Sequence, residues 1–213
     1  MKTNAQSILL DYRTLRLLMG LIAFLLPPVV TLIASTALPS ISASYYTQAR
    51  DEFVGLLFIV GSLWLAYNGR STQEMRMSKV AALAAIGVAV FPESPGNSSP
   101  GSWVSTAHVV CAVTMFSILA YFCFGPFRQF TKGQPGKKRL RSNIYLVCGW
   151  IMVGCMVFYA LATRLLPGEL VRELRLTYWT ETIALAAFGV AWMVASKVFS
   201  VFADPEDKLY LFR

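Results

Sequence analysis

The chain has 213 residues, of which 56% are hydrophobic and only 14% are charged, and its formal net charge is +8. A soluble domain carries about 25% charged residues, whereas here the apolar residues form long runs and the mean hydropathy is +0.55. This composition excludes an ordinary soluble protein and indicates an integral membrane protein.

The apolar runs predict an all-α fold, a polytopic six-transmembrane-helix bundle that forms one domain over residues 1–213. Each run is close to the ~20 residues that a helix needs to cross ~30 Å of hydrocarbon. In chain order, the predicted spans are about 16–37, 53–68, 75–91, 107–127, 144–163 and 178–201.

The first predicted helix has a basic start, as a signal peptide does. Its apolar stretch is longer than that of a typical signal peptide, and no clear small-residue cleavage site follows it. We therefore expect a retained helix. Pro27 and Pro28 lie inside it and lack backbone N–H donors, so a kink is expected there.

Small residues mark places where helices are expected to approach closely in lipid. The third predicted helix consists mostly of Ala, Val and Gly (AALAAIGVAV), which favours a central place in the bundle. Two pairs of glycines are expected to allow close contacts in the second and fifth helices: Gly55 with Gly61, and Gly149 with Gly154.

The basic residues predict the orientation of the helices. Of the 19 Lys and Arg residues, only four lie in segments 38–52, 92–106 and 164–177, and the others lie toward the chain ends and near 69–79 and 128–142. Because segments rich in Lys and Arg stay in the cytoplasm, we predict that both termini are cytoplasmic. This sorting accounts for the positive charge without nucleic acid. Binding of anionic lipid headgroups is an alternative role for the loop at 128–142.

Polar residues gather at the predicted outer end of the bundle. The second, fourth and sixth helices run inward, and each begins near an ionisable residue: Asp51, His108 (the only histidine) and Glu181. Serines precede the second helix, among them Ser42, and Glu93 follows the third. Ionisable groups at membrane depth are costly and tend to mark function. We therefore predict a catalytic site that contains Asp51, His108, Glu181 and Ser42.

The same residues suggest a cofactor. One imidazole and two carboxylates suit a divalent metal ion, so Asp51, His108 and Glu181 are candidate metal ligands, and the metal would activate water. A structural role is the alternative, because a carboxylate in the first turn of a helix interacts favourably with its positive end. An interfacial histidine beside a Ser and a Thr also needs no further role.

Three neighbouring residues on the same side are candidates for binding a lipid headgroup or another anion: Arg50, Tyr45 and Tyr46. The competing explanation for the tyrosines is an aromatic belt at the level of the headgroups. Arg50 can pair either with a lipid phosphate or with Asp51.

The pattern LPSISASYYTQARDEFVG, followed by FP, a helix with one His, CGWIM and YWTETIALAAFGVAW, resembles a family of six-helix bacterial inner-membrane proteins that carries a domain of unknown function. The resemblance implies the fold and an inner-membrane location. A more distant likeness is to the alkaline ceramidase and adiponectin receptor superfamily, whose members use a serine, an aspartate and three histidines to hold zinc for amide hydrolysis. Ser42 or Ser44, Asp51 and His108 match in type, but one histidine cannot build a three-histidine site.

The sequence leaves two classes of function open. One is a hydrolase or transferase that acts on lipid and depends on a metal. The other is a protein without chemistry of its own, either for binding or transport or as an accessory scaffold. Transport is disfavoured because the spans hold almost no charge at mid-depth and the two halves show no repeat. Membrane lipids, and not nucleic acid, are the expected partners.

Overall fold

The computed structural model describes residues 12–93 and 103–204, and this part of the chain is 78% helical with no strand. The all-α prediction is therefore confirmed. The helices are α1 (Tyr12–Ala34), α2 (Arg50–Ala66), α3 (Thr72–Val90), α4 (Trp103–Phe124), α5 (Gly136–Leu165), α6 (Gly168–Glu173) and α7 (Leu176–Ser196), and a short 3-10 helix, η1 (Ser42–Tyr46), lies between α1 and α2.

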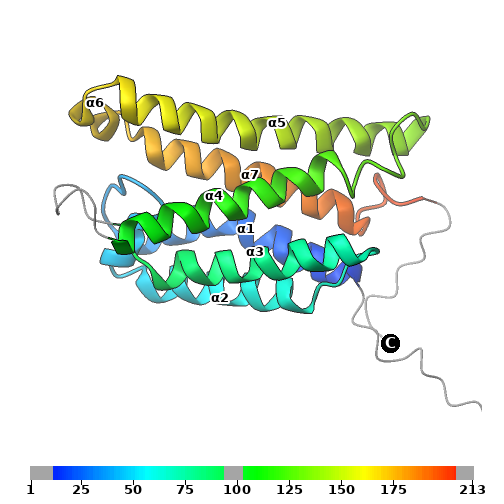
Figure 1. Ribbon diagram of the computed structural model, residues 1–213, viewed down its shortest axis with the longest axis horizontal. Helices are drawn as coiled ribbons and strands as arrows, with labels where there is room; N and C mark the ends of the chain where they lie inside the picture. The colour runs from blue at the N-terminus through cyan, green and yellow to red at the C-terminus, as the bar shows by residue number, and fades with distance from the viewer. Residues whose placement is uncertain (1–11, 94–102, 205–213) are drawn as a thin grey trace, which may run out of the picture.

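The six long helices run side by side along the longest axis of the molecule (Figure 1). Helix α1 packs against α2 and α7, α3 lies between α2 and α4, and α5 lies between α4 and α7, so the order of neighbours closes into a ring. The expectation that the third helix is central was wrong, because within residues 12–93 and 103–204 α3 has only α2 and α4 as helix neighbours. Helix α7, by contrast, packs against α1, α4, α5 and α6.

Among the described helices, four are long and apolar enough to cross a membrane, namely α1, α4, α5 and α7, which is compatible with a membrane protein. Each predicted span overlaps one long helix, yet α2 has only 17 residues and α3 begins with the polar stretch TQEMRMSK. Helix α5 reaches 30 residues because it starts in the basic segment GKKRLRSN. Lys and Arg are good helix formers, so the helix continues beyond its apolar part.

Glycines permit close packing at some of the predicted positions. A Cβ atom added at Gly61 would lie 2.9 Å from Cγ1 of Ile86, and one added at Gly149 would lie 2.7 Å from the Phe124 ring. These two predictions are confirmed. The predictions for Gly55 and Gly154 were wrong, because a Cβ atom there would meet open space. The prediction of close contacts therefore held only for the glycine of each pair that faces another helix.

An aromatic cluster ties α2, α4 and α7 together inside the bundle. Trp64 and Trp192, each at most 1% exposed, pack edge to face with ring centroids 4.5 Å apart. The rings of Phe122 in α4 and Phe188 in α7 each pack against both tryptophans. This packing holds the helices in register, so residues at both ends of the bundle keep fixed positions.

The two ends of the bundle differ in character. Figure 1 shows α6 and the α1–α2 connection, which contains η1, at one end, which we call the η1 end. The other end holds the α2–α3 and α4–α5 connections, the start of α1 and the last described residues. We call this the basic end, after the cavity residues Arg16, Arg70, Lys138, Arg141 and Lys197 that lie there.

Asp204 fastens the last described residues to the basic end. Its carboxylate accepts hydrogen bonds from Arg141, with Nη2 at 2.8 Å and Nη1 at 3.2 Å, and from Lys197 Nζ at 3.1 Å. Arg141 is only 1% exposed, so it contributes a bidentate, largely desolvated contact. These bonds, that from Arg141 first, lower the pKa of Asp204 from 3.8 to about 2.

We expect Asp204→Asn to lower the stability of the protein at neutral pH and to flatten its response to acid. The pKa of Asp204 is lower in the folded protein than in the unfolded chain. Its contribution to the free energy of unfolding is therefore fully present above pH 3.8 and is lost as the pH falls toward about 2. Melting temperatures measured between pH 7 and pH 2 would show this. Equal acid sensitivity of the wild type and the variant in that window would contradict it.

Candidate functional site

The segment that precedes α2 is fastened to the start of α7 at the η1 end. The backbone N–H of Tyr178 donates to the carbonyl of Pro39 over 3.1 Å, and Arg175 Nε donates to the carbonyl of Leu38 over 2.8 Å. Within the segment, the hydroxyl of Ser44 donates to the carbonyl of Ile41 over 2.6 Å. These bonds hold the first turn of η1 against α7.

Ser42 and His108 form a buried pair inside this junction. The distance between Ser42 Oγ and His108 Nε2 is 3.0 Å, and the two residues are 6% and 3% exposed. On the other side of the ring, His108 Nδ1 lies 2.7 Å from the carbonyl oxygen of Phe91. A carbonyl only accepts hydrogen bonds, so Nδ1 carries a proton, and in the neutral imidazole Nε2 then accepts from the hydroxyl of Ser42.

The sequence explains why the carbonyl of Phe91 is available to accept a hydrogen bond from His108. Pro92 follows Phe91 and pushes it out of helical geometry, and Phe91 is extended at the C-terminus of α3, with φ −97° and ψ 103°. The last carbonyls of a helix lack partners within it. The carbonyl of Phe91 therefore remains available to His108, which α4 places opposite it.

Glu181, in the second turn of α7, holds Ser42 from the other side. One carboxylate oxygen, Oε2, accepts from the backbone N–H of Ile41 at 2.5 Å and of Ser42 at 3.4 Å. The other, Oε1, lies 3.4 Å from Ser42 Oγ. Ser42 thus stands between an imidazole and a carboxylate.

A second serine and carboxylate lie next to this group. Ser40 donates from Oγ to Glu93 Oε2 over 2.6 Å and accepts from the backbone N–H of Ala43 over 2.9 Å. Glu93, His108 and Glu181 all line one cavity. The bond between Ser40 and Glu93 was not predicted, although the alternating serines of the sequence could have suggested a turn with two inward hydroxyls.

The cavity has a volume of about 290 Å³ and is bounded by α4, α5 and α7. Its polar lining comes from the η1 ends of these helices and from Glu93, which follows α3. Its apolar lining includes Val113 and Phe116 of α4 and Met156 of α5. From His108 to Phe116, α4 advances about 12 Å at 1.5 Å per residue. The site therefore continues from its polar groups into an apolar space of more than two helical turns.

The structure separates the predicted metal ligands. His108 and Glu181 both contact Ser42, whereas Asp51 is exposed in the first turn of α2. Among the residues that the structure describes, no three His, Cys, Asp or Glu side chains are grouped so as to hold a metal ion. Three of the four predicted catalytic residues are thus adjacent, and the fourth lies apart.

The residues predicted to bind a lipid headgroup or an anion do lie together. Arg50 Nη2 donates to the hydroxyl of Tyr45 over 2.8 Å, and its guanidinium lies 4.4 Å from the centre of that ring. The ring of Tyr46 packs edge to face against Tyr45. The cluster is on the surface of the η1 end, since Arg50 and Tyr46 are exposed.

The fold and the site define a helical protein, compatible with a membrane location, in which a buried serine contacts a histidine that lines a largely apolar cavity. No family model, no curated protein and no solved structure matches the chain. The geometry of the site therefore carries the functional assignment.

Proposed function

We propose that the protein is a membrane hydrolase or acyltransferase that acts on lipid, with Ser42 as the nucleophile and His108 as the general base. The observation that carries this proposal is the 3.0 Å contact between Ser42 Oγ and His108 Nε2, with the imidazole oriented by the carbonyl of Phe91 at 2.7 Å. A nucleophile bonded to a base that a third group orients is the arrangement of activated serines.

The chemistry follows from these positions. The oxygen of Ser42 attacks the carbonyl carbon of an ester or amide while its proton passes to His108 Nε2. The tetrahedral centre then expels the alcohol or amine, which takes that proton from His108. Water, or a second alcohol in a transfer, next attacks the acyl-serine and gives its proton to His108 Nε2. The bond to Ser42 Oγ then breaks, Oγ takes the proton back from His108, and the acid or the new ester leaves. The carbonyl of Phe91, which accepts from His108 Nδ1, favours the imidazolium that forms in each step.

The cavity supports a lipid as the substrate. Its volume of about 290 Å³ is near the lower end of the ~300–1,000 Å³ found for small-molecule sites. Its apolar wall, with Val113, Phe116 and Met156, suits part of an acyl chain, and His108, which contacts Ser42, belongs to its polar lining.

The proposed setting is a bacterial inner membrane crossed by six helices, with both termini in the cytoplasm and membrane lipids as partners. Support comes from the side-by-side arrangement of the six long helices (Figure 1) and from the five basic residues that line the cavity at the basic end. The start of α1 and the last described residues lie at that same end. This orientation would place Ser42 and His108 toward the outer leaflet.

A fluorophosphonate probe, which forms a covalent bond with activated serines, tests the proposal. We expect the purified protein to be labelled at Ser42, as located by mass spectrometry, and labelling to be lost in His108→Ala. In Ser44→Ala, which removes a nearby hydroxyl that donates to the carbonyl of Ile41, labelling should persist. Labelling that does not depend on His108 would contradict the proposal. Elemental analysis of the same samples tests the metal-dependent alternative, which stoichiometric metal lost in His108→Ala would favour.

A further inference from the structure

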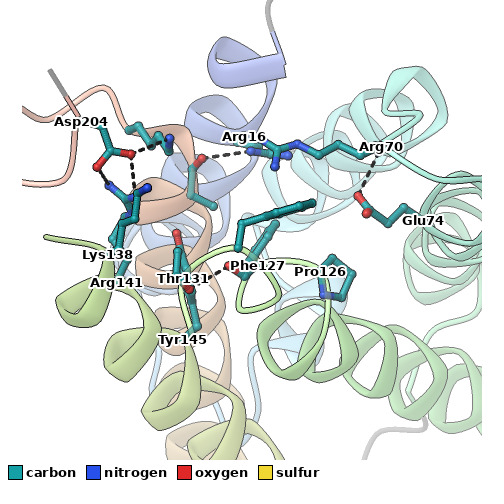
Figure 2. A pocket seen from close by; sticks show the side chains of 13 residues that line it. Arg16, Arg70, Glu74, Pro126, Phe127, Thr131, Lys138, Arg141, Tyr145 and Asp204 are labelled. Carbon is teal, nitrogen blue, oxygen red and sulfur yellow. Dashed lines mark hydrogen bonds and ion pairs between the residues drawn. The ribbon is translucent and has the colours of Figure 1, made fainter. Parts of the chain in front are cut away.

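A second cavity lies at the basic end, on the opposite side of the molecule from Ser42. It has a volume of about 280 Å³ and is formed by α1, α3, α5, the two connections at this end and the end of α7. Figure 2 shows Arg16 and Phe127 between Arg141 with Asp204 on one side and Arg70 with Glu74 on the other. Its basic lining residues are Arg16, Arg70, Lys138, Arg141 and Lys197, and its acidic ones are Glu74 and Asp204.

The two carboxylates do not neutralise this lining. Asp204 is engaged by Arg141 and Lys197. Glu74 accepts from the backbone N–H of Arg70 at 3.1 Å and from Gln129 Nε2 at 3.5 Å, and within the described chain it forms no ion pair. Five basic side chains therefore face two carboxylates across one small cavity.

Arg16 is held by neutral groups alone in the part of the chain that the structure describes. Its Nη2 and Nε donate to the hydroxyl of Tyr67 at 2.6 and 3.1 Å, and its Nη1 donates to the carbonyl of Ala195 at 3.1 Å. The guanidinium also lies 5.5 Å from the centre of the Phe127 ring. A guanidinium has five N–H donors, so a fixed positive charge with two remaining donors borders the cavity.

Arg141 gives a second, independent indication. Its side chain is only 1% exposed, and its Nε is buried without a hydrogen-bond partner in the described structure. A buried donor that lacks a partner is unfavourable. An anion in the cavity would offer acceptors to the arginines that line it.

We propose that this basic cavity binds a phosphate group, carried either by a phospholipid headgroup or by a soluble phosphate compound. Phosphate matches the arginine guanidinium, which can donate two parallel hydrogen bonds to its oxygens, while Lys138 adds a mobile positive charge. The site is distinct from the Ser42–His108 pair, because the two cavities share no lining residue and are lined by opposite ends of α5 and α7. The proposal does not depend on the hydrolase function.

The test compares two sources of phosphate on the purified full chain. Inorganic phosphate is titrated against chloride at equal ionic strength, with the melting temperature as the measurement. Separately, the protein is mixed with phosphatidylglycerol and phosphatidylcholine, and the lipid it retains is identified by mass spectrometry. A rise in melting temperature with inorganic phosphate supports a soluble ligand, and selective retention of phosphatidylglycerol supports a headgroup. The absence of both effects would overturn the proposal.

Matched variants show whether the cavity itself binds. Arg16→Gln should weaken the apparent affinity for inorganic phosphate or for phosphatidylglycerol at least tenfold. The control is Arg76→Gln, which removes an equal charge from an exposed position of α3 outside the cavity, and it should leave that affinity unchanged. Lys138→Gln serves if Arg16→Gln fails to fold, because Lys138 is exposed and its loss should also weaken binding. Equal loss in the cavity variants and in Arg76→Gln would indicate general surface charge and would overturn the proposal.

Discussion

Replacing His108 with alanine is expected to lower the rate of the proposed lipid hydrolysis or transfer by about 100- to 10,000-fold, the range for a general base. Ser42→Ala should lower it as much or more, because it removes the nucleophile itself. The two side chains are joined by the 3.0 Å contact between Oγ and Nε2 and act as one unit. The double variant should therefore be about as slow as the slower single variant. Release of fatty acid from labelled phospholipid or ceramide by the purified protein measures these rates.

Ser44→Ala is the matched control for this series. Ser44 lies in the same 3-10 helix and is completely buried, but its hydroxyl bonds the carbonyl of Ile41 and not the histidine. We expect its activity to stay within a few-fold of the wild type. Melting temperatures show whether each variant is folded. Folded Ser42→Ala with full activity would contradict the assignment of the nucleophile.

A residue of the candidate site could be predicted only where its position along the helix also fixed the direction of its side chain. His108 and Glu181 lie near the starts of helices that run the same way, so similar depth was enough to bring both to Ser42. Asp51 has similar depth but points outward. The buried face of α2 runs through Phe53 and Leu57, and two residues correspond to about 200° around a helix, which puts Asp51 on the opposite side from Phe53.

The helices were easier to predict than their arrangement. Apolar runs locate helices because a membrane demands apolar length, and every predicted span overlaps a long helix. Which helices become neighbours depends on side-chain fit, which small residues alone do not specify. Helix α3 is rich in alanine, yet it lies in the ring between α2 and α4. The 3-10 turn of Ser42 depends on contacts with Glu181 and with α7, far away in sequence, so it could not be predicted locally.

A close approach between α1 and α7 predicts a large effect on stability. A Cβ atom added at Gly189 would lie 2.8 Å from the carbonyl oxygen of Gly20, and one added at Gly20 would lie 2.8 Å from the carbonyl oxygen of Gly189. A backbone atom cannot turn away as a side chain can. Gly189→Val should therefore force the helices apart and lower the free energy of unfolding by about 3 kcal/mol, the upper end of the usual range for overpacking.

Unfolding of the purified protein in mixed micelles, followed by circular dichroism, measures this loss. Gly154→Val is the control, because Gly154 is a helical glycine of α5 whose added Cβ would meet nothing within 4 Å. Its stability should change by less than about 1 kcal/mol, through helix propensity alone. Equal stability of the two variants would show that α1 and α7 do not pack through these glycines. Because α7 also carries Glu181, which holds the backbone of Ser42, Gly189→Val should reduce catalysis as well, and Gly154→Val should not.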